Sequence, residues 1–591
     1  MSYRAPVQDL LFVMKELAGI DAVAALPGHE DAGLDTAAAV LQECARFNQE
    51  VVAPLNWAGD QNPSSFKAGV VTTTPGFRQA FRQFAEGGWQ GLQHPTAFGG
   101  QGLPKLIGAA CCEMVNSANM SFALCPLLTD GAIEALLTAG TDAQQVAYIP
   151  NMISGRWTGT MNLTEPQAGS DLSLVRTRAE PQADGSYKLF GTKIYITYGE
   201  HDMADNIVHL VLARVVGAPE GVKGISLFIC PKMLPDGSRN DVHCVSIEHK
   251  LGIKASPTAV LQYGDHGGAV AHLVGQENRG LETMFIMMNA ARFQVGVQGV
   301  ALAERAYQKA VAYARDRVQS RPVDGSIQAA APIIHHPDVR RMLMRMRAHT
   351  EACRAMALVA ASAYDAAHAH PDATTRRQNQ AFYEFLVPLV KGLSTEMSLE
   401  VASLGVQVHG GMGFIEETGA AQYLRDAKIL TIYEGTTAIQ ANDLVGRKTA
   451  RDGGQVARAI ARRIETTVGE LNARSSAAGR TLARRLEAAR SAFVDAVDFV
   501  AGQTQAQPNA VFAGSVPYLM LAGTTVAGWQ MARALMAAED RLAEGVDTEF
   551  MAAKIATARF YGDHILNQVP ALRDSIVEGA EAVTALALES F

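Results

Sequence analysis

The feature that most constrains the fold of this chain is a run of short, β-rich segments between two long stretches of helical sequence. Each segment is rich in β-branched or aromatic residues, and turn sequences such as ADGS, LPDGSR and GDHGG separate them. Short strands at this spacing are typical of an antiparallel barrel or sandwich of about 120 residues. The expected strands span residues 157–163, 187–196, 206–214, 223–230, 242–247, 257–263 and 269–275.

Helical periodicity dominates on both sides of these strands. Gly- and Pro-containing turns divide the N-terminal part into several helices, and the part after the strands carries the pattern of four or five long helices. Beyond residue 448 the composition shifts to Ala, Arg and Glu, with helices expected near 454–475, 480–502, 509–541 and 548–587. We therefore predict an α+β, mostly α fold with an N-terminal helical domain (1–156), a β-barrel domain (157–280), a helical bundle (281–448) and an additional helical domain (449–591).

Length and composition support a multi-domain globular protein. A chain of 591 residues is too long for one hydrophobic core, and 48% hydrophobic with 19% charged residues is an ordinary soluble balance. No segment reaches the roughly 18 uninterrupted apolar residues expected of a membrane-spanning helix. The first 25 residues mix acidic and basic side chains, unlike a signal or transit peptide. These observations predict a cytoplasmic protein.

Charge and cysteine usage argue against two classes of function. The net charge of −8 argues against a nucleic-acid partner, and the Arg-rich stretch at 458–485 is better explained as a solvated helix surface. The seven cysteines are scattered, with no CxxC pair and no Cys/His cluster at metal-ligand spacing. We therefore expect reduced, buried thiols and no metal site. A small anionic ligand remains compatible with this composition.

Two segments of the β-rich region could contact a flat, polar ligand. MNLTEPQAGSD (161–171) ends a strand in a turn whose Thr164 and Ser170 could hold a heterocycle or a phosphate. KIYITYG (193–199) is a strand that carries Tyr195 and Thr197 on one face, where they could back a flat ring. A simple bulge loop and a core-lining strand are the alternative interpretations.

Three further features lie in the helical part. Arg292 and Arg317 could bind phosphate, although a helix arginine is usually a surface ion pair. QVHGGMGF (407–414) places several glycines in a helical context, where each costs about 1 kcal/mol relative to alanine. Close backbone approach to a ligand would explain them better than packing does. The preceding strand of a dinucleotide-binding fingerprint is absent from this pattern.

In the segment YLRDAKILTIYEGTTAIQAND (423–443), a carboxylate follows directly after an apolar run. Glu434 follows Tyr433 and precedes Gly435. A carboxyl group that is desolvated there would have a raised pKa and would be a better base near neutral pH. The alternative is a solvated glutamate that complements the dipole of the following helix.

Five motifs occur in the order LTEPQAGSD, KIYITYG, LGIKASPTAVL, QVHGGMGF and LRDAKILTIYEGTTAIQ, and together they resemble the acyl-CoA dehydrogenase family. The resemblance covers roughly residues 40–448. The opening YRAPVQDLLFVMKEL and the C-terminal addition resemble the 3-(methylthio)propionyl-CoA dehydrogenase subgroup, whose members are also described as acting on fatty acyl-CoA thioesters. The implied fold is a helical domain, a β-barrel domain and a four-helix domain. The implied activity is FAD-dependent oxidation of an acyl-CoA to its trans-2-enoyl-CoA.

The resemblance also implies roles for individual residues. Glu434 would be the catalytic base that removes the α-proton, with Arg292, Tyr433 and Gly435 beside the acyl-CoA. The expected contacts of the flavin on the barrel side are Met161, Leu163, Thr164, Ser170, Tyr195 and Thr197, and Ser170 would also reach CoA. Thr436 would hydrogen-bond FAD from the motif of the base. The adenine and pyrophosphate end of FAD would be bound across a dimer interface by Arg317, Gln407 and Gly411.

The chain departs from the family pattern at several positions. Tyr195 stands where many members carry Trp, and Met161 replaces a frequent aromatic residue. Met288 stands near a position that is often Asp, which puts CoA contacts there in doubt. The sequence QSR at 319–321 replaces a usual Phe-Gly pattern, which weakens the assignment of the inter-subunit contact. None of these departures affects the base.

The resemblance implies a homodimer that passes electrons to an electron-transfer flavoprotein, and two alternatives stay open. An acyl-CoA oxidase would use the same fold and base with O2 as the acceptor. A DNA-associated flavoprotein of the same superfamily would need a strongly basic face, which the net charge of −8 does not favour. The C-terminal helices could stand where a second dimer would dock or could rest on a membrane surface.

Overall fold

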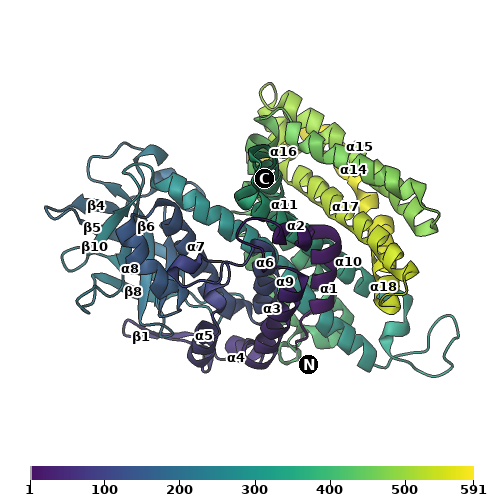
Figure 1. Cartoon of the computed structure of the whole chain (residues 1–591), viewed down its shortest axis with the longest axis horizontal. Helices are drawn as coiled ribbons and strands as arrows, with labels where there is room; N and C mark the ends of the chain where they lie inside the picture. The colour runs from purple at the N-terminus through teal and green to yellow at the C-terminus, as the bar shows by residue number, and fades with distance from the viewer. Residues whose placement is uncertain (1–2) are drawn as a thin grey trace.

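The computed structural model describes residues 3–591 and shows three bodies of secondary structure along its longest axis (Figure 1). The β-strands gather at one end, long helices fill the centre, and the C-terminal helices form a layer on the far side of these central helices. The predicted fold class, a mostly helical chain with a middle barrel and an appended helical region, is confirmed.

The N-terminal region is helical except for one small hairpin. β1 (Ser65–Lys67) and β2 (Val70–Thr72) pair within a segment predicted only as a turn. α7 (Met120–Ala139) is long and apolar enough to cross a membrane, but 83% of its most apolar window is buried, as in the core helix of a globular domain. The other helices are α1 (Val7–Phe12), α2 (Ile20–Ala24), α3 (Leu34–Phe47), α4 (Leu55–Gln61), α5 (Phe77–Glu86), α6 (Lys105–Ala118) and α8 (Asp142–Ile153).

The middle strands close into a barrel. Strands run in the order β10-β7-β6-β4-β5, and a pairing of β10 with β5 closes the ring, while β9 and β8 continue outward from β5. The expected all-antiparallel arrangement is wrong in part, because β3 and β4 both pair with β6 in parallel. The strands are β3 (Trp157–Asn162), β4 (Arg178–Pro181), β5 (Tyr187–Thr197), β6 (Asn206–Val215), β7 (Ser226–Pro231), β8 (Val242–Ile247), β9 (Thr258–Tyr263) and β10 (Ala269–Val274).

Within residues 280–448, three long helices and two short ones follow the barrel, instead of the four or five long helices predicted. They are α9 (Gly280–Asp316), α10 (Pro337–Ala369), α11 (Ala373–His409), α12 (Ala420–Lys428) and α13 (Thr437–Val445). The glycines of QVHGGMGF end α11 rather than lie inside it: Gly410 has φ +59°, and a Cβ on Gly413 would lie 2.2 Å from the Val406 carbonyl oxygen. Gly296 and Gly299 of α9 let the backbone of α11 approach closely, because a Cβ there would lie 2.6 and 2.4 Å from its carbonyl oxygens.

The C-terminal helices pack on the central helices mainly through α17. Gly392 of α11 faces Leu519 of α17 so closely that a Cβ would lie 2.6 Å from the leucine side chain. The helices of this region are α14 (Gln455–Ala473), α15 (Ala477–Gln503), α16 (Pro508–Ala513), α17 (Ser515–Ala543), α18 (Thr548–His564), α19 (Val569–Val577) and α20 (Ala580–Thr584).

A buried network of charged side chains joins the N-terminal, central and C-terminal helices. Arg354 of α10 donates to Asp9 of α1 at 2.6 Å, to Glu113 of α6 and to Glu304 of α9 at 2.7 Å. Lys554 of α18 forms a further ion pair with Asp9. Because all of these groups are buried, each charge depends on its partners for stabilisation. The network therefore links helices that are far apart in the sequence.

Candidate active site

The Tyr433–Thr436 turn between α12 and α13 carries the predicted base in an unusual backbone conformation. Glu434 has φ +53° and Gly435 has φ +86°, so two consecutive residues are left-handed. Glycine adopts this conformation freely, whereas a glutamate there is strained and must be held by its surroundings. Thr436 ends the turn as the N-cap of α13, where its Oγ1 accepts a hydrogen bond from the Ile439 N–H at 3.2 Å.

Two buried side chains form hydrogen bonds to the backbone of this turn. Nζ of Lys391, on α11, donates to the carbonyl oxygens of Leu430 and Gly435, each at 2.7 Å. Nε2 of Gln440, on α13, donates to the carbonyl oxygens of Glu434 and Gly435, each at 3.2 Å. Burial lowers the pKa of the Lys391 ammonium group to about 8. The left-handed pair is thus fixed by contacts from both neighbouring helices.

The electrostatic surroundings of Glu434 suit a base that works near neutral pH. Its side chain is half-buried, and burial raises the pKa of the carboxyl to about 7 against the opposing effects of Arg292 and Lys391. Arg292 is only 3% exposed, and its Nη1 lies 3.6 Å from Oδ2 of Asp443. Its Nη2 lies beside the turn, 3.7 Å from the position of a Cβ on Gly435. The positive charge of Arg292 therefore lowers the pKa of the Glu434 carboxyl, but by less than burial raises it.

A chain of hydrogen bonds leads from the turn into the interior. The Tyr433 hydroxyl donates to Oε1 of Gln298 on α9, and Nε2 of Gln298 donates to Oδ1 of Asn116 on α6 at 2.9 Å. Asn116 lines a cavity of about 60 Å³ between the N-terminal helices and α9. The base turn and this cavity are therefore connected through side chains in direct contact.

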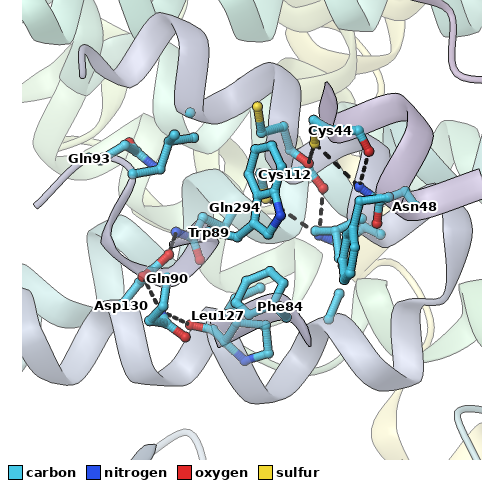
Figure 2. A pocket seen from close by; sticks show the side chains of 18 residues that line it. Cys44, Asn48, Phe84, Trp89, Gln90, Gln93, Cys112, Leu127, Asp130 and Gln294 are labelled. Atoms are coloured by element: carbon cyan, nitrogen blue, oxygen red, sulfur yellow. Dashed lines mark hydrogen bonds between the residues drawn. The ribbon is translucent and has the colours of Figure 1, made fainter. Parts of the chain in front are cut away.

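The cavity is lined by aromatic rings, thiols and amides (Figure 2). Phe84 and Trp89 provide rings and Cys44 and Cys112 provide sulfur atoms, while Gln294 reaches it from α9. A wider cavity of about 410 Å³ shares Gln93, Asp130 and Gln294 with it and carries more charged groups. The sequence did not reveal either cavity, because the lining residues come from α3, α5, α6, α7 and α9 as well as from the loops between them.

The predicted flavin contacts on the barrel side lie along β3 and the loop that follows it. Met161 is buried in β3, Leu163 and Thr164 are half-buried, and Ser170 is exposed. A buried ion pair between Glu165 and Lys193, with 2.8 Å between the charged atoms, holds this loop against β5. Glu165 also accepts from the Thr177 N–H and hydroxyl, so the glutamate of LTEP is structural.

Tyr195 presents an aromatic ring to the outside of the barrel. It lies at a bulge in β5 with φ +60°, and the residue is 61% exposed. Thr197 is half-buried two residues further along the strand. An exposed ring held on a bulge is unusual for a core-lining strand, and it offers the flat apolar face that a flavin ring would stack on. These residues therefore fit the flavin end of FAD.

The other predicted FAD contacts lie at the opposite end of α9. Arg317 follows the last residue of α9, while Gln407 and Gly411 lie at the end of α11, and all three are exposed. Tyr313 and His409 stack with ring centroids 4.4 Å apart, so the two helix ends lie side by side. The 37 residues of α9 span roughly 55 Å, and its first residue contacts the barrel at Ile225. Arg317, Gln407 and Gly411 therefore form a separate exposed group at the ends of α9 and α11.

Models of one enzyme family match four consecutive parts of the chain. They are the acyl-CoA dehydrogenase N-terminal domain (35–156), middle domain (160–266) and C-terminal domain (278–448), and the acetyl-CoA dehydrogenase C-terminal-like domain (460–587). The fold is that of an acyl-CoA dehydrogenase, and the chain belongs to this family of oxidoreductases, with FAD as its cofactor.

Full-length relatives support the same assignment. The chain is 54% identical to a 3-methylmercaptopropionyl-CoA dehydrogenase of Ruegeria pomeroyi, with 100% of both chains covered. It is 35% identical to a broad-specificity linear acyl-CoA dehydrogenase of Mycobacterium tuberculosis, with 97% of both covered. A solved Bacillus anthracis acyl-CoA dehydrogenase complexed with FAD has the same fold, with a TM-score of 0.76, 22% identity, and 97% of this chain and 93% of that chain covered.

Proposed function

We propose that this protein removes two hydrogens from the α and β carbons of a short acyl-CoA, giving a trans-2-enoyl-CoA, with Glu434 as the base. The observation that carries the proposal is the state of Glu434. It is half-buried, its pKa is raised to about 7 by burial, and its left-handed backbone is pinned by Lys391 and Gln440. A structural surface glutamate would have no reason to combine these features.

The turn also offers a donor for the charge that develops on the substrate. A proton next to a thioester is too weakly acidic for a carboxylate unless the negative charge on the carbonyl oxygen is stabilised as it forms. Within residues 3–591, the backbone N–H of Glu434 donates to no protein acceptor, so it is free to bind this oxygen. FAD, when bound, supplies the acceptor for the hydride from the β carbon.

The proposed assembly is a homodimer. Tyr195 and Thr197 of one chain would meet the flavin, and Arg317, Gln407 and Gly411 of the second chain would meet the other end of FAD. The family resemblance supports this division, because it implies an FAD site that is completed across a subunit interface. The electron acceptor in this proposal is an electron-transfer flavoprotein, as the family resemblance favours, and the proposed compartment is the cytoplasm.

The proposed substrate is 3-(methylthio)propionyl-CoA or a linear acyl-CoA of similar length. The name of the 54% identical relative supports 3-(methylthio)propionyl-CoA. The size of the cavity lined by Phe84 and Trp89 supports a linear acyl-CoA of similar length. A space of about 60 Å³ holds only a few carbon or sulfur atoms. Phe84 and Trp89 would contact a thioether favourably, since sulfur interacts well with aromatic ring edges.

An anaerobic titration tests the proposal. The FAD-loaded protein is mixed with 3-(methylthio)propionyl-, butyryl-, octanoyl- and palmitoyl-CoA, and flavin absorbance is followed. Prompt bleaching by the first two, with slower or no bleaching by the longer thioesters, is the expected result. Absence of bleaching with every thioester, despite bound FAD, would refute the function. Rapid peroxide formation in air would instead identify an oxidase.

A further inference from the structure

Two histidines and one aspartate form a cluster on the surface of the barrel, outside the candidate active site. Asp241 immediately precedes β8, His243 lies in β8, and His266 lies in the turn between β9 and β10. One potential ligand atom from each residue lies within 4.8 Å of the others. Oδ1 of Asp241 is 3.2 Å from Nδ1 of His266 and 3.4 Å from Nε2 of His243.

These separations match the spacing of ligands around a tetrahedral metal ion. Zinc binds imidazole nitrogen and carboxylate oxygen at about 2.0–2.2 Å, so two tetrahedral ligands lie about 3.3–3.5 Å from each other. Hydrogen bonding accounts for only one of the two contacts: His266 is hydrogen-bonded to Oδ1 of Asp241. Among residues 3–591, His243 makes no hydrogen bond to this carboxylate, although its Nε2 lies near the same oxygen.

The carboxylate of Asp241 is held in place by the turn opposite it. Its Oδ2 accepts from the backbone N–H groups of His266 at 2.7 Å and of Gly268 at 3.0 Å. Gly267 and Gly268 make this possible, because they adopt φ of +114° and +107°. Such outer contacts orient a carboxylate for metal binding and leave Oδ1 available.

We propose that Asp241, His243 and His266 bind one divalent transition-metal ion, with Zn²⁺ as the fitting ion and water as the remaining ligand. Two imidazoles and one carboxylate favour zinc over calcium or magnesium, which prefer oxygen ligands throughout. The ion would join the start of β8 to the β9–β10 turn and stabilise that edge of the barrel.

The proposed metal site lies at the other end of β9 from Thr197, one of the predicted flavin contacts. Val242 pairs with Tyr263 at one end of β9, whereas Thr197 pairs with Thr258 at the other end. The length of β9 between these pairs is roughly 17 Å. Metal binding and the acyl-CoA half-reaction are therefore expected to be independent of each other.

The test is a calorimetric titration of chelator-treated, FAD-loaded, full-length protein with Zn²⁺. We expect one ion per chain, and at least about tenfold weaker binding for His243→Ala, His266→Ala and Asp241→Asn. The control is His272→Ala, an exposed histidine on β10 outside the cluster, which should leave the Kd within about twofold. Co²⁺ in place of Zn²⁺ would give an intense visible spectrum if the site is tetrahedral.

Folding of each variant is checked by FAD absorbance and by bleaching with acyl-CoA in the absence of metal. Asp241→Asn also removes contacts to the β9–β10 turn. His243→Ala is therefore the decisive variant, because His243 contributes no hydrogen bond to the cluster. Equal Zn²⁺ affinity in wild type, His243→Ala and His272→Ala, or no binding by wild type at micromolar Zn²⁺, would overturn the proposal. Loss of binding in His243→Ala alone among these three would support it.

Discussion

The ammonium group of Lys391 supports the left-handed backbone at Glu434, because its Nζ donates at 2.7 Å to the carbonyl oxygen of the next residue, Gly435. The lysine is completely buried and also binds the carbonyl oxygen of Leu430. It therefore acts on the base in two ways, by holding the turn and by contributing a nearby positive charge. Replacement of this one side chain should change both geometry and acidity.

Lys391→Met should lower kcat at least about tenfold with little change in KM, because the base would lose its fixed position. It should also raise the apparent pKa of the pH–rate profile, since the charge that lowers the pKa of Glu434 is gone. Lys428→Met is the control, because Lys428 is exposed at the end of α12. Equal kcat and equal pH profiles for the two variants would argue that Lys391 is merely structural.

The pH dependence of the wild-type enzyme follows from the state of Glu434. Its carboxyl must be ionised to remove a proton, and burial raises its pKa to about 7. The value of kcat/KM should therefore fall about tenfold per pH unit below pH 7 and become constant above it. Glu434→Gln should retain FAD and lose at least about a thousandfold in rate. Substantial turnover by that variant would assign the base to another residue.

The width of the small cavity should depend on Trp89, whose ring lines it and stacks on Phe47. Trp89→Ala would enlarge the cavity and should raise the kcat/KM ratio of octanoyl-CoA to butyryl-CoA by about tenfold or more, since each buried CH₂ contributes about 0.8 kcal/mol. Trp57→Ala, at an exposed tryptophan outside the cavity, should leave the ratio unchanged. A ratio that does not move in either variant would place the acyl chain elsewhere.

Arg354→Met should destabilise the protein by about 3–5 kcal/mol, because it leaves the carboxylates of Asp9, Glu113 and Glu304 without their shared partner. Thermal or denaturant unfolding of the FAD-loaded protein measures the loss. Arg462→Met serves for comparison, since Arg462 is exposed on α14 and makes no ion pair within the described residues. Comparable stability of both variants would mean that the buried network contributes little.

Much of the fold could be predicted from the sequence, because β-branched segments and turn residues report local structure directly. The strand β4 was missed, since Arg178–Pro181 is short, charged and ends in proline. The hairpin of β1 and β2 was missed for a similar reason, being only three residues per strand. The number of long helices was overestimated because the glycines after His409 end α11.

The candidate site was predictable only where its residues are neighbours in the chain. Tyr433, Glu434 and Gly435 form a motif, and their sequence suggested a desolvated base. Lys391 and Gln298 come from distant helices, and the only signal was a lysine inside the apolar run FLVPLVKGL. No pattern in the sequence brings Trp89, Cys112 and Gln294 to one cavity, because packing of separate helices does this.

The position of Arg317 at the exposed end of α9 has a consequence for mixtures of damaged chains. In the proposed dimer each FAD site takes its base from one subunit and Arg317 from the other. A subunit that lacks Glu434 and a subunit that lacks Arg317 would then place both defects in the same site. The second site of that hybrid would have neither, so two chains that are each inactive alone would regain about a quarter of the wild-type activity when they are refolded together and pair at random.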